Sequence, residues 1–289
     1  MSKPARQRIE ALLVRGVFAV FGLMPVDMAS AVGGWIGRLV GPRLKVSGVA
    51  RRNLARAFPD RGQDWIERVV VQVWDNLGRV VAEFPHIRYL MDNRVEIVGA
   101  EHIHALRDDG RPGLFFSGHL GNWELCPASV GRQGLPLALV YREANNPWVE
   151  DIYRKGRDGM PHAGQIPKGT EGARDIMAVL RKGGHVGMLV DQKMNDGITV
   201  PFFGRDAMTA PAVARFAVRF GCPVVPGWVQ RVGGAHFRLT VLPPIQTAGT
   251  GDVHADTQDF MVRVNAMLED WIRSDPGQWL WLHKRWPEN

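Results

Sequence analysis

Short apolar runs that alternate with amphipathic stretches fill the chain after residue 90, and this alternation limits the possible folds most strongly. The apolar runs have the length and the residue types of β-strands, and they lie at 94–99, 113–118, 136–142, 185–191, 222–230 and 237–243. The stretches with helical periodicity lie at 101–108, 121–132, 147–158, 171–182, 210–220 and 254–273. Strands that alternate with helices predict an α/β fold with a mixed, mostly parallel central sheet flanked by helices.

The domain organisation that we expect is simple. A chain of 289 residues can bury a substantial core, and the sequence contains no internal repeat, no low-complexity linker and no second domain boundary. We therefore predict a single layered α/β domain over residues 46–289. A helical segment that associates with a membrane interface, residues 1–45, precedes it.

The N-terminal segment is apolar but interrupted by charges at Arg15, Asp27 and Arg38. Its longest uncharged run, residues 16–26, falls short of the roughly 18–20 residues that cross a bilayer. We predict one or two amphipathic helices in the membrane interface, anchored by Trp35 and flanking arginines. A signal peptide cleaved near the ASA triplet, or an ordinary core helix hairpin, are the alternatives.

The composition and the absence of certain motifs limit the classes of partner and cofactor that we expect. The net charge of +7 favours an anionic partner, which includes nucleic acid, acidic lipid headgroups and an acidic carrier protein. The basic residues are spread along the chain without a recognised module, so we expect no nucleic acid. Cys126 and Cys222 are far apart, which argues against a disulfide or a cysteine metal site. The motifs GxxxxGK[ST], GxGxxG after a strand, HExxH and GxSxG are absent, and we predict no metal and no organic cofactor.

A histidine ends the apolar run of the segment FFSGHLGNWE, residues 115–124, and a glutamate follows it by five positions. The same His–x₄–acid spacing also occurs at His104/Asp109, His254/Asp259 and His283/Glu288, so the spacing alone proves nothing. Only His119 follows a buried strand and precedes a turn that begins a helix, where α/β sheets bind ligands. Glu124 in the first helical turn could therefore meet His119.

The chemistry open to such a pair is general-base catalysis. A neutral imidazole can take a proton from an attacking hydroxyl, and a carboxylate behind it fixes the tautomer and stabilises the imidazolium. No serine or cysteine nucleophile is needed. The pair suits a direct transfer onto an activated acyl group.

Five motifs in order, SGHLGNWE, YREANNP, GR at 156–157, VDQK and VPFFG, resemble those of the lipid A late acyltransferases of Gram-negative bacteria. That family belongs to the wider lysophospholipid acyltransferase-like superfamily, and the resemblance covers roughly residues 10–245. It implies an enzyme bound to the cytoplasmic face of the inner membrane. The implied reaction moves a fatty acyl chain from a thioester of acyl carrier protein, or of coenzyme A, to a hydroxyl on a phosphorylated lipid A precursor.

The resemblance also assigns roles to individual residues. His119 is implied to be the general base and Glu124 its orienting partner. Arg142 and Arg157 match basic positions that hold sugar phosphates or steady the developing oxyanion. The remaining substrate-binding candidates are Asp191, Gln192, Lys193 and Arg205. Each of these basic residues could instead be a solvated charge, and Asp191 a satisfied polar residue at a strand end.

Other readings stay open. The HLGNWE motif fits the broad superfamily as well as one subgroup, so the acceptor could be a lysophospholipid or another glycolipid. A non-catalytic lipid- or membrane-binding protein and a thioesterase-like hydrolase are further alternatives. The C-terminal tryptophans, at 271, 279, 281 and 286, could line an acyl groove, lie at the bilayer interface or pack in the core.

Overall fold

A seven-stranded sheet forms the centre of the computed structural model, which describes residues 3–287. Its strand order is β1-β9-β8-β2-β5-β3-β4. The strands are β1 (Val95–Val98), β2 (Gly113–Ser117), β3 (Ala138–Tyr141), β4 (Gln165–Pro167), β5 (His185–Leu189), β8 (Val224–Gly233) and β9 (His236–Val241). Every neighbouring pair is parallel except the β8–β9 hairpin. The predicted mixed, mostly parallel sheet is confirmed.

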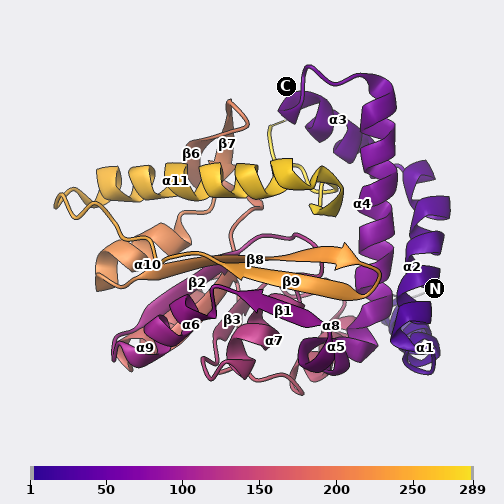
Figure 1. Cartoon of the computed structure of the whole chain (residues 1–289), viewed down its shortest axis with the longest axis horizontal. Coiled ribbons are helices and arrows are strands. Elements are labelled where there is room, and N and C mark those ends of the chain that lie inside the picture. The colour runs from indigo at the N-terminus through magenta and orange to yellow at the C-terminus, as the bar shows by residue number, and fades with distance from the viewer. Residues whose placement is uncertain (1–2, 288–289) are drawn as a thin grey trace.

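Helices cover both faces of this sheet (Figure 1). The helices within and after the sheet region are α6 (Ala100–Asp108), α7 (Leu125–Arg132), α8 (Pro147–Arg157), α9 (Thr170–Arg181), α10 (Ala212–Phe220) and α11 (Val253–Ser274). All six predicted helices are present, although α7 begins four residues later than expected. Three strands were not predicted: β4 and the antiparallel hairpin of β6 (Lys193–Phe202) and β7 (Arg205–Thr209).

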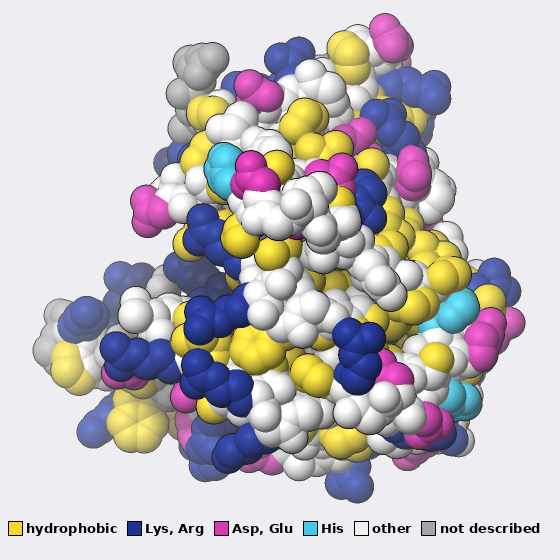
Figure 2. Space-filling view, turned by 90° about the vertical axis from the view of Figure 1, so that its left-hand side faces the viewer, with side chains coloured by type: hydrophobic (Ala, Val, Ile, Leu, Met, Phe, Trp, Pro, Cys, Tyr) yellow, Lys and Arg dark blue, Asp and Glu magenta, His cyan; other side chains and the backbone are white. Residues whose placement is uncertain are grey.

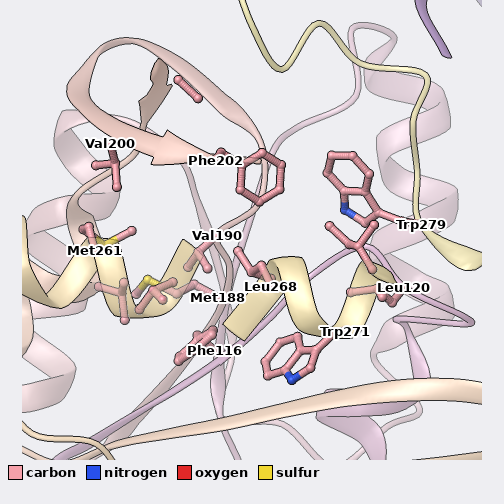
Figure 3. Close-up of a cluster of buried hydrophobic side chains, with 14 of the residues drawn as sticks. Phe116, Leu120, Met188, Val190, Val200, Phe202, Met261, Leu268, Trp271 and Trp279 are labelled. Carbon is pink, nitrogen blue, oxygen red and sulfur yellow. The ribbon is translucent and has the colours of Figure 1, made fainter. Parts of the chain in front are cut away.

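The two layers of core explain why β2 is buried at every position and mostly apolar. Phe115 belongs to the cluster under α6 and α7, whereas Phe116 belongs to the cluster under α10 and α11. Successive side chains of a strand point to opposite faces, so a strand covered on both sides reads as a continuous apolar run. Phe116 stacks on Trp271 of α11 at 5.7 Å between ring centroids, and the two lie together in Figure 3.

The N-terminal part of the chain is helical throughout most of its length. It consists of α1 (Lys3–Gly22), α2 (Val26–Val40), α3 (Ser47–Ala57), α4 (Gln63–Glu83) and α5 (Ile87–Asn93). Helices α2 and α4 lie side by side because Gly33 and Gly78 face each other (Figure 1). A Cβ atom on Gly33 would lie 2.4 Å from the carbonyl oxygen of Gly78, so a larger residue would separate the helices.

Helices α1 and α2 leave many large apolar side chains exposed. These are Ile9, Leu12, Leu13, Val17, Val20, Met28, Trp35, Ile36, Leu39 and Val40. Within residues 3–287, no helix is both long enough and apolar enough to cross a membrane. The segment is helical, as expected, and its membrane association stays a prediction.

The C-terminal segment, residues 275–287, folds back over the carboxyl edge of the sheet. Trp279 and Trp286 pack on Phe202 of β6, and Trp281 packs on Trp279. All three are buried, as is Trp271 of α11. Of the readings open for these tryptophans, core packing is confirmed. Cys126 is also buried, as expected of a small apolar residue.

Candidate active site

The candidate residues gather where four neighbouring parallel strands end. His119 follows β2, Asp191 follows β5, Arg142 follows β3 and Lys168 follows β4. Ligands in open α/β sheets bind at this carboxyl edge, because loops leave the strands there and the strand ends present side chains to a common space.

The imidazole of His119 is held by Asp191. Nδ1 of the ring lies 2.7 Å from Oδ1 of Asp191, and the backbone N–H of His119 donates to Oδ2 at 2.8 Å. The carboxylate can only accept, so Nδ1 carries the proton and Nε2 keeps its lone pair. This arrangement prepares Nε2 to act as a base.

Asp191 is fully buried and satisfied by several donors. Besides the two bonds from His119, its Oδ2 accepts a bond from the indole Nε1 of Trp279 at 2.7 Å. Burial acts to raise the pKa of this carboxyl, but the His119 imidazole and its hydrogen bonds outweigh burial and hold the pKa well below its usual range. Asp191 is therefore ionised at neutral pH and can stabilise an imidazolium.

The other nitrogen of His119 lies on the open side of the ring. Nε2 is 3.4 Å from Nε2 of Gln192, and the ring packs edge-on to Trp123 at 5.3 Å between centroids. The His119 side chain is 14% exposed, so a substrate hydroxyl can approach while most water is excluded.

The expected contact between His119 and Glu124 is not formed, and this corrects the sequence expectation. Glu124 instead accepts two bonds from Arg157 of α8, at 2.7 and 2.9 Å. Glu124 precedes α7, and its carboxylate turns toward α8 rather than toward the strand end. Among the described residues, the carboxylate bonded to His119 is that of Asp191.

The side chain of Arg157 is held by its contacts with neighbouring side chains. Its guanidinium lies over the rings of Tyr141 and Tyr153 as well as against Glu124, and its side chain is 16% exposed. Burial acts to lower the pKa of Arg157, but its bonds to Glu124 outweigh this and raise the pKa, so the guanidinium is charged. Arg157 joins α8 to the turn that carries His119.

The remaining basic candidates are spread more widely. Arg142 is exposed at the end of β3, and Lys193 is partly exposed at the start of β6. Arg205 is exposed at the start of β7 and donates to the carbonyl of Arg56 in α3 at 3.3 Å. Arg142 thus lies at the strand ends with His119, whereas Arg205 lies at the turn of the hairpin.

Two residues near the site were missed by the sequence reasoning. Lys168 adjoins Arg142, because the parallel register pairs Tyr141 with Pro167 one position earlier. Desolvation by the surrounding protein lowers the pKa of Lys168, repulsion from Arg142 lowers it further, and Asp191 opposes both effects. Trp279 was noted only as one of several tail aromatics. No predicted strand precedes Lys168, because β4 was not predicted, and no local signal marks Trp279.

An apolar pocket opens beside the histidine. Its empty volume is about 510 Å³ including the mouth, and it lies between β2, β3, β5 and α7. Its walls are Phe115, Ser117, Trp123, Cys126, Pro127, Leu137, Leu139, Val140, Gly187, Met188 and Leu189, with Glu124, Tyr141 and Arg157 also at its lining. Trp123, which contacts His119, lines it too, so an apolar chain held there can reach the histidine.

The fold and the site together define an α/β protein with an imidazole held by a buried carboxylate beside an apolar pocket. Residues 3–287 contain no group of three or more His, Cys, Asp or Glu side chains that could hold a metal ion. The imidazole of His119 and its buried carboxylate have the arrangement that general-base catalysis uses.

The chain belongs to the family of bacterial lipid A biosynthesis acyltransferases, whose model matches residues 3–288. It is therefore an acyltransferase. The chain is 23% identical over 279 residues to the lipid A biosynthesis palmitoleoyltransferase of Escherichia coli K12, an alignment that covers 93% of this chain and 88% of that protein. It is 26% identical over 279 residues to the lipid A biosynthesis lauroyltransferase of the same organism, with 93% and 89% covered.

A relative that is named for a different acceptor matches nearly as much of the chain. The phosphatidylinositol mannoside acyltransferase of Mycolicibacterium smegmatis is 24% identical over 279 residues, covering 91% of this chain and 86% of that protein. Similar overall identity to both kinds of relative does not by itself separate their acceptors.

Proposed function

We propose that this acyltransferase moves a fatty acyl chain from a thioester, that of acyl carrier protein, to a hydroxyl of a lipid A precursor. The family membership supports the acceptor class. One observation carries the mechanism: Nδ1 of His119 donates to the buried Asp191 carboxylate and leaves Nε2 free to accept a proton.

The proposed reaction is a single acyl transfer. Nε2 of His119 removes the proton from the acceptor hydroxyl while that oxygen attacks the thioester carbonyl carbon. The tetrahedral intermediate collapses, the carbon–sulfur bond breaks, and the departing thiolate takes the proton from the imidazolium. The ionised Asp191 stabilises the imidazolium during both transfers and keeps the ring in the productive tautomer.

Glu124 takes a different part in this mechanism from the orienting role first expected. Its two bonds to Arg157 tie the turn after β2 to α8, and together the two side chains line the pocket beside His119. We assign to the pair the positioning of that turn and of the pocket mouth.

The apolar pocket suits the acyl chain of the donor. Most of its lining consists of aliphatic and aromatic side chains from three strands and α7, with a few polar groups among them. Pockets that are apolar with a few convergent polar groups are typical ligand sites. The thioester carbonyl would lie at the mouth, next to His119.

The acceptor phosphates would be bound by basic side chains around the strand ends. Arg142 is exposed there, and no ion pair within the described part of the chain occupies it. Lys168 stands beside it, while Gln192 and Lys193 follow Asp191 into the hairpin. Figure 2 shows the side of the molecule opposite the arrowhead of β8 in Figure 1, and Lys and Arg side chains lie beside hydrophobic ones there too, in keeping with the net charge of +7.

The enzyme would work at the cytoplasmic face of the inner membrane, as a peripheral or monotopic protein. The exposed apolar side chains of α1 and α2 would enter the lipid interface, with residues 1–45 as the associating segment. The positive net charge favours both an anionic lipid surface and an acidic carrier protein.

A second candidate acceptor is a different glycolipid. It is favoured by the match to a phosphatidylinositol mannoside acyltransferase. The chemistry at His119 would be the same, because both acceptors present a hydroxyl on a phosphorylated lipid. Only the acceptor would differ.

The test is acyl transfer by the purified full chain in mixed micelles, with acyl carrier protein thioester as donor and lipid A precursor, phosphatidylinositol mannoside or lysophospholipid as acceptor. We expect mass spectrometry to detect one added acyl chain on the lipid A precursor with wild type and none with His119→Ala. Transfer to one of the other acceptors alone would overturn the lipid A assignment. Release of free fatty acid without any acceptor would indicate a thioesterase.

A further inference from the structure

The carboxylate of Asp191 has a third donor that lies far away in the sequence. Trp279 is 1% exposed, and its indole N–H bonds to the same oxygen, Oδ2, that accepts the backbone N–H of His119. The two oxygens of Asp191 therefore hold different groups: Oδ1 faces the imidazole, and Oδ2 is fixed by two N–H donors.

The backbone around Trp279 also holds the loop that carries His119. The N–H of Leu280 donates to the carbonyl of His119 at 3.1 Å, and the N–H of Gly121 donates to the carbonyl of Gln278 at 3.1 Å. Leu120 and Trp279 form an antiparallel bridge, and their side chains lie close together in Figure 3. The tail thus contacts the loop at the histidine and at the two residues that follow it.

From this geometry we propose that Trp279 is a positioning residue of the acyltransferase, which sets the orientation and the effective charge of Asp191 through its indole N–H. The proposal rests on the function proposed above. It gives the C-terminal segment 275–286 a part in catalysis in addition to its packing.

The physical argument concerns the negative charge that His119 experiences. An N–H donor aimed at a carboxylate oxygen spreads part of its charge and fixes its plane. Without the indole N–H, the carboxylate would be more basic and less firmly oriented, so the imidazolium would be favoured while the ring is less well held. The rate should fall, and the acidic limb of the pH–rate profile should move to higher pH.

Other ionisable groups near Asp191 contribute to the same field and must be kept. They are His119 from the β2–α7 turn, His283 and Arg285 from the tail, and Lys168 after β4. The change should therefore remove only the indole N–H. Trp279→Phe retains an aromatic ring between Leu120 and Phe202 and leaves all four groups in place.

Trp281 offers a matched control. It is 0% exposed and packs on Trp279 at 4.5 Å between ring centroids, but its indole N–H donates to the carbonyl of Pro276 at 2.8 Å and not to Asp191. Trp281→Phe therefore removes the same atoms from the same aromatic cluster without touching the charge of Asp191.

For Trp279→Phe we expect kcat to fall about ten-fold with KM within about two-fold, and the acidic limb to rise by about half a pH unit. Trp281→Phe should keep the wild-type pH profile, whatever its loss of thermal stability. Equal pH profiles and equal kcat for the two variants would overturn the proposal, since Trp279 would then act only as a packing residue.

A second measurement does not depend on activity. In ¹H–¹⁵N spectra of the full chain in detergent, the indole resonance that disappears in Trp279→Phe should be shifted strongly by Asp191→Asn, whereas that of Trp281 should move little. An unmoved Trp279 resonance would overturn the inference even if acyl transfer is confirmed. Loss of the proposed acyl transfer with a shifted resonance would instead overturn the function and leave the positioning contact established.

Discussion

Asp191→Asn provides the sharpest test of the catalytic pair, because the change keeps the shape of a fully buried side chain and alters only its charge and donors. Oδ1 of Asp191 accepts from Nδ1 of His119, while Oδ2 accepts from the His119 backbone N–H and the Trp279 indole. An amide nitrogen at the Oδ2 position would face two donors, so the amide should place its nitrogen toward the imidazole instead. Nδ1 must then accept, and the proton moves to Nε2, the nitrogen required as base.

The expected loss can be estimated from this geometry. A forced change of tautomer, together with loss of the charge that stabilises the imidazolium, should lower kcat on the order of 10³–10⁴-fold. Glu124→Gln supplies the comparison. Glu124 contacts Arg157 rather than His119, so this change should cost about ten-fold or less, chiefly through the pocket mouth. Both variants are assayed by single-turnover transfer from acyl carrier protein thioester, with circular dichroism to verify folding.

The reasoning would be refuted if Glu124→Gln, correctly folded, lowered the single-turnover rate as much as Asp191→Asn or more.

The free energy of unfolding gives an independent test, because its change with pH has an expected direction. The pKa of Asp191 is lower in the folded protein than its ordinary value, so its charge stabilises the fold above about pH 4 and this contribution fades as the pH falls below that value. Asp191→Asn should therefore lose more stability at pH 7 than at pH 3, and thermal melts at the two values measure the difference.

Two further predictions concern the acyl chain and the membrane. Leu139→Phe adds bulk to the pocket wall and should shift the preferred acyl chain toward donors shorter by about one or two carbons, measured by competition among thioesters; an unchanged preference would place the chain elsewhere. The double change Leu12→Asp and Val20→Asp on the exposed face of α1 should lower binding to anionic vesicles about ten-fold or more in a flotation assay. The control Val253→Asp with Val262→Asp, on exposed positions of α11, should bind like wild type, and equal losses for both pairs would contradict the proposed docking face.

The sequence was sufficient for the layered fold because the pattern of the sheet region is strong. Strands covered on both faces, such as β2, are apolar at nearly every position, and the helices between them show amphipathic periodicity. The hairpin of β6 and β7 was missed because β6 begins with the mostly polar sequence KMNDG, and buried and exposed positions alternate only toward its far end. Strand β4 has three residues and lies at the sheet edge, too short for an alternation to be visible.

The partner of His119 was assigned to Glu124 because the two residues are close in the sequence, whereas the sheet selects Asp191. Strands β2 and β5 are parallel neighbours with Ser117 opposite Leu189, so His119 and Asp191 each stand two residues beyond the same register pair. Parallel strands that end together bring their following residues together, while a residue at the start of the next helix is carried away from the strand end. Local spacing could therefore identify the histidine but not its carboxylate, since the pairing depends on a strand order that joins residues 72 positions apart.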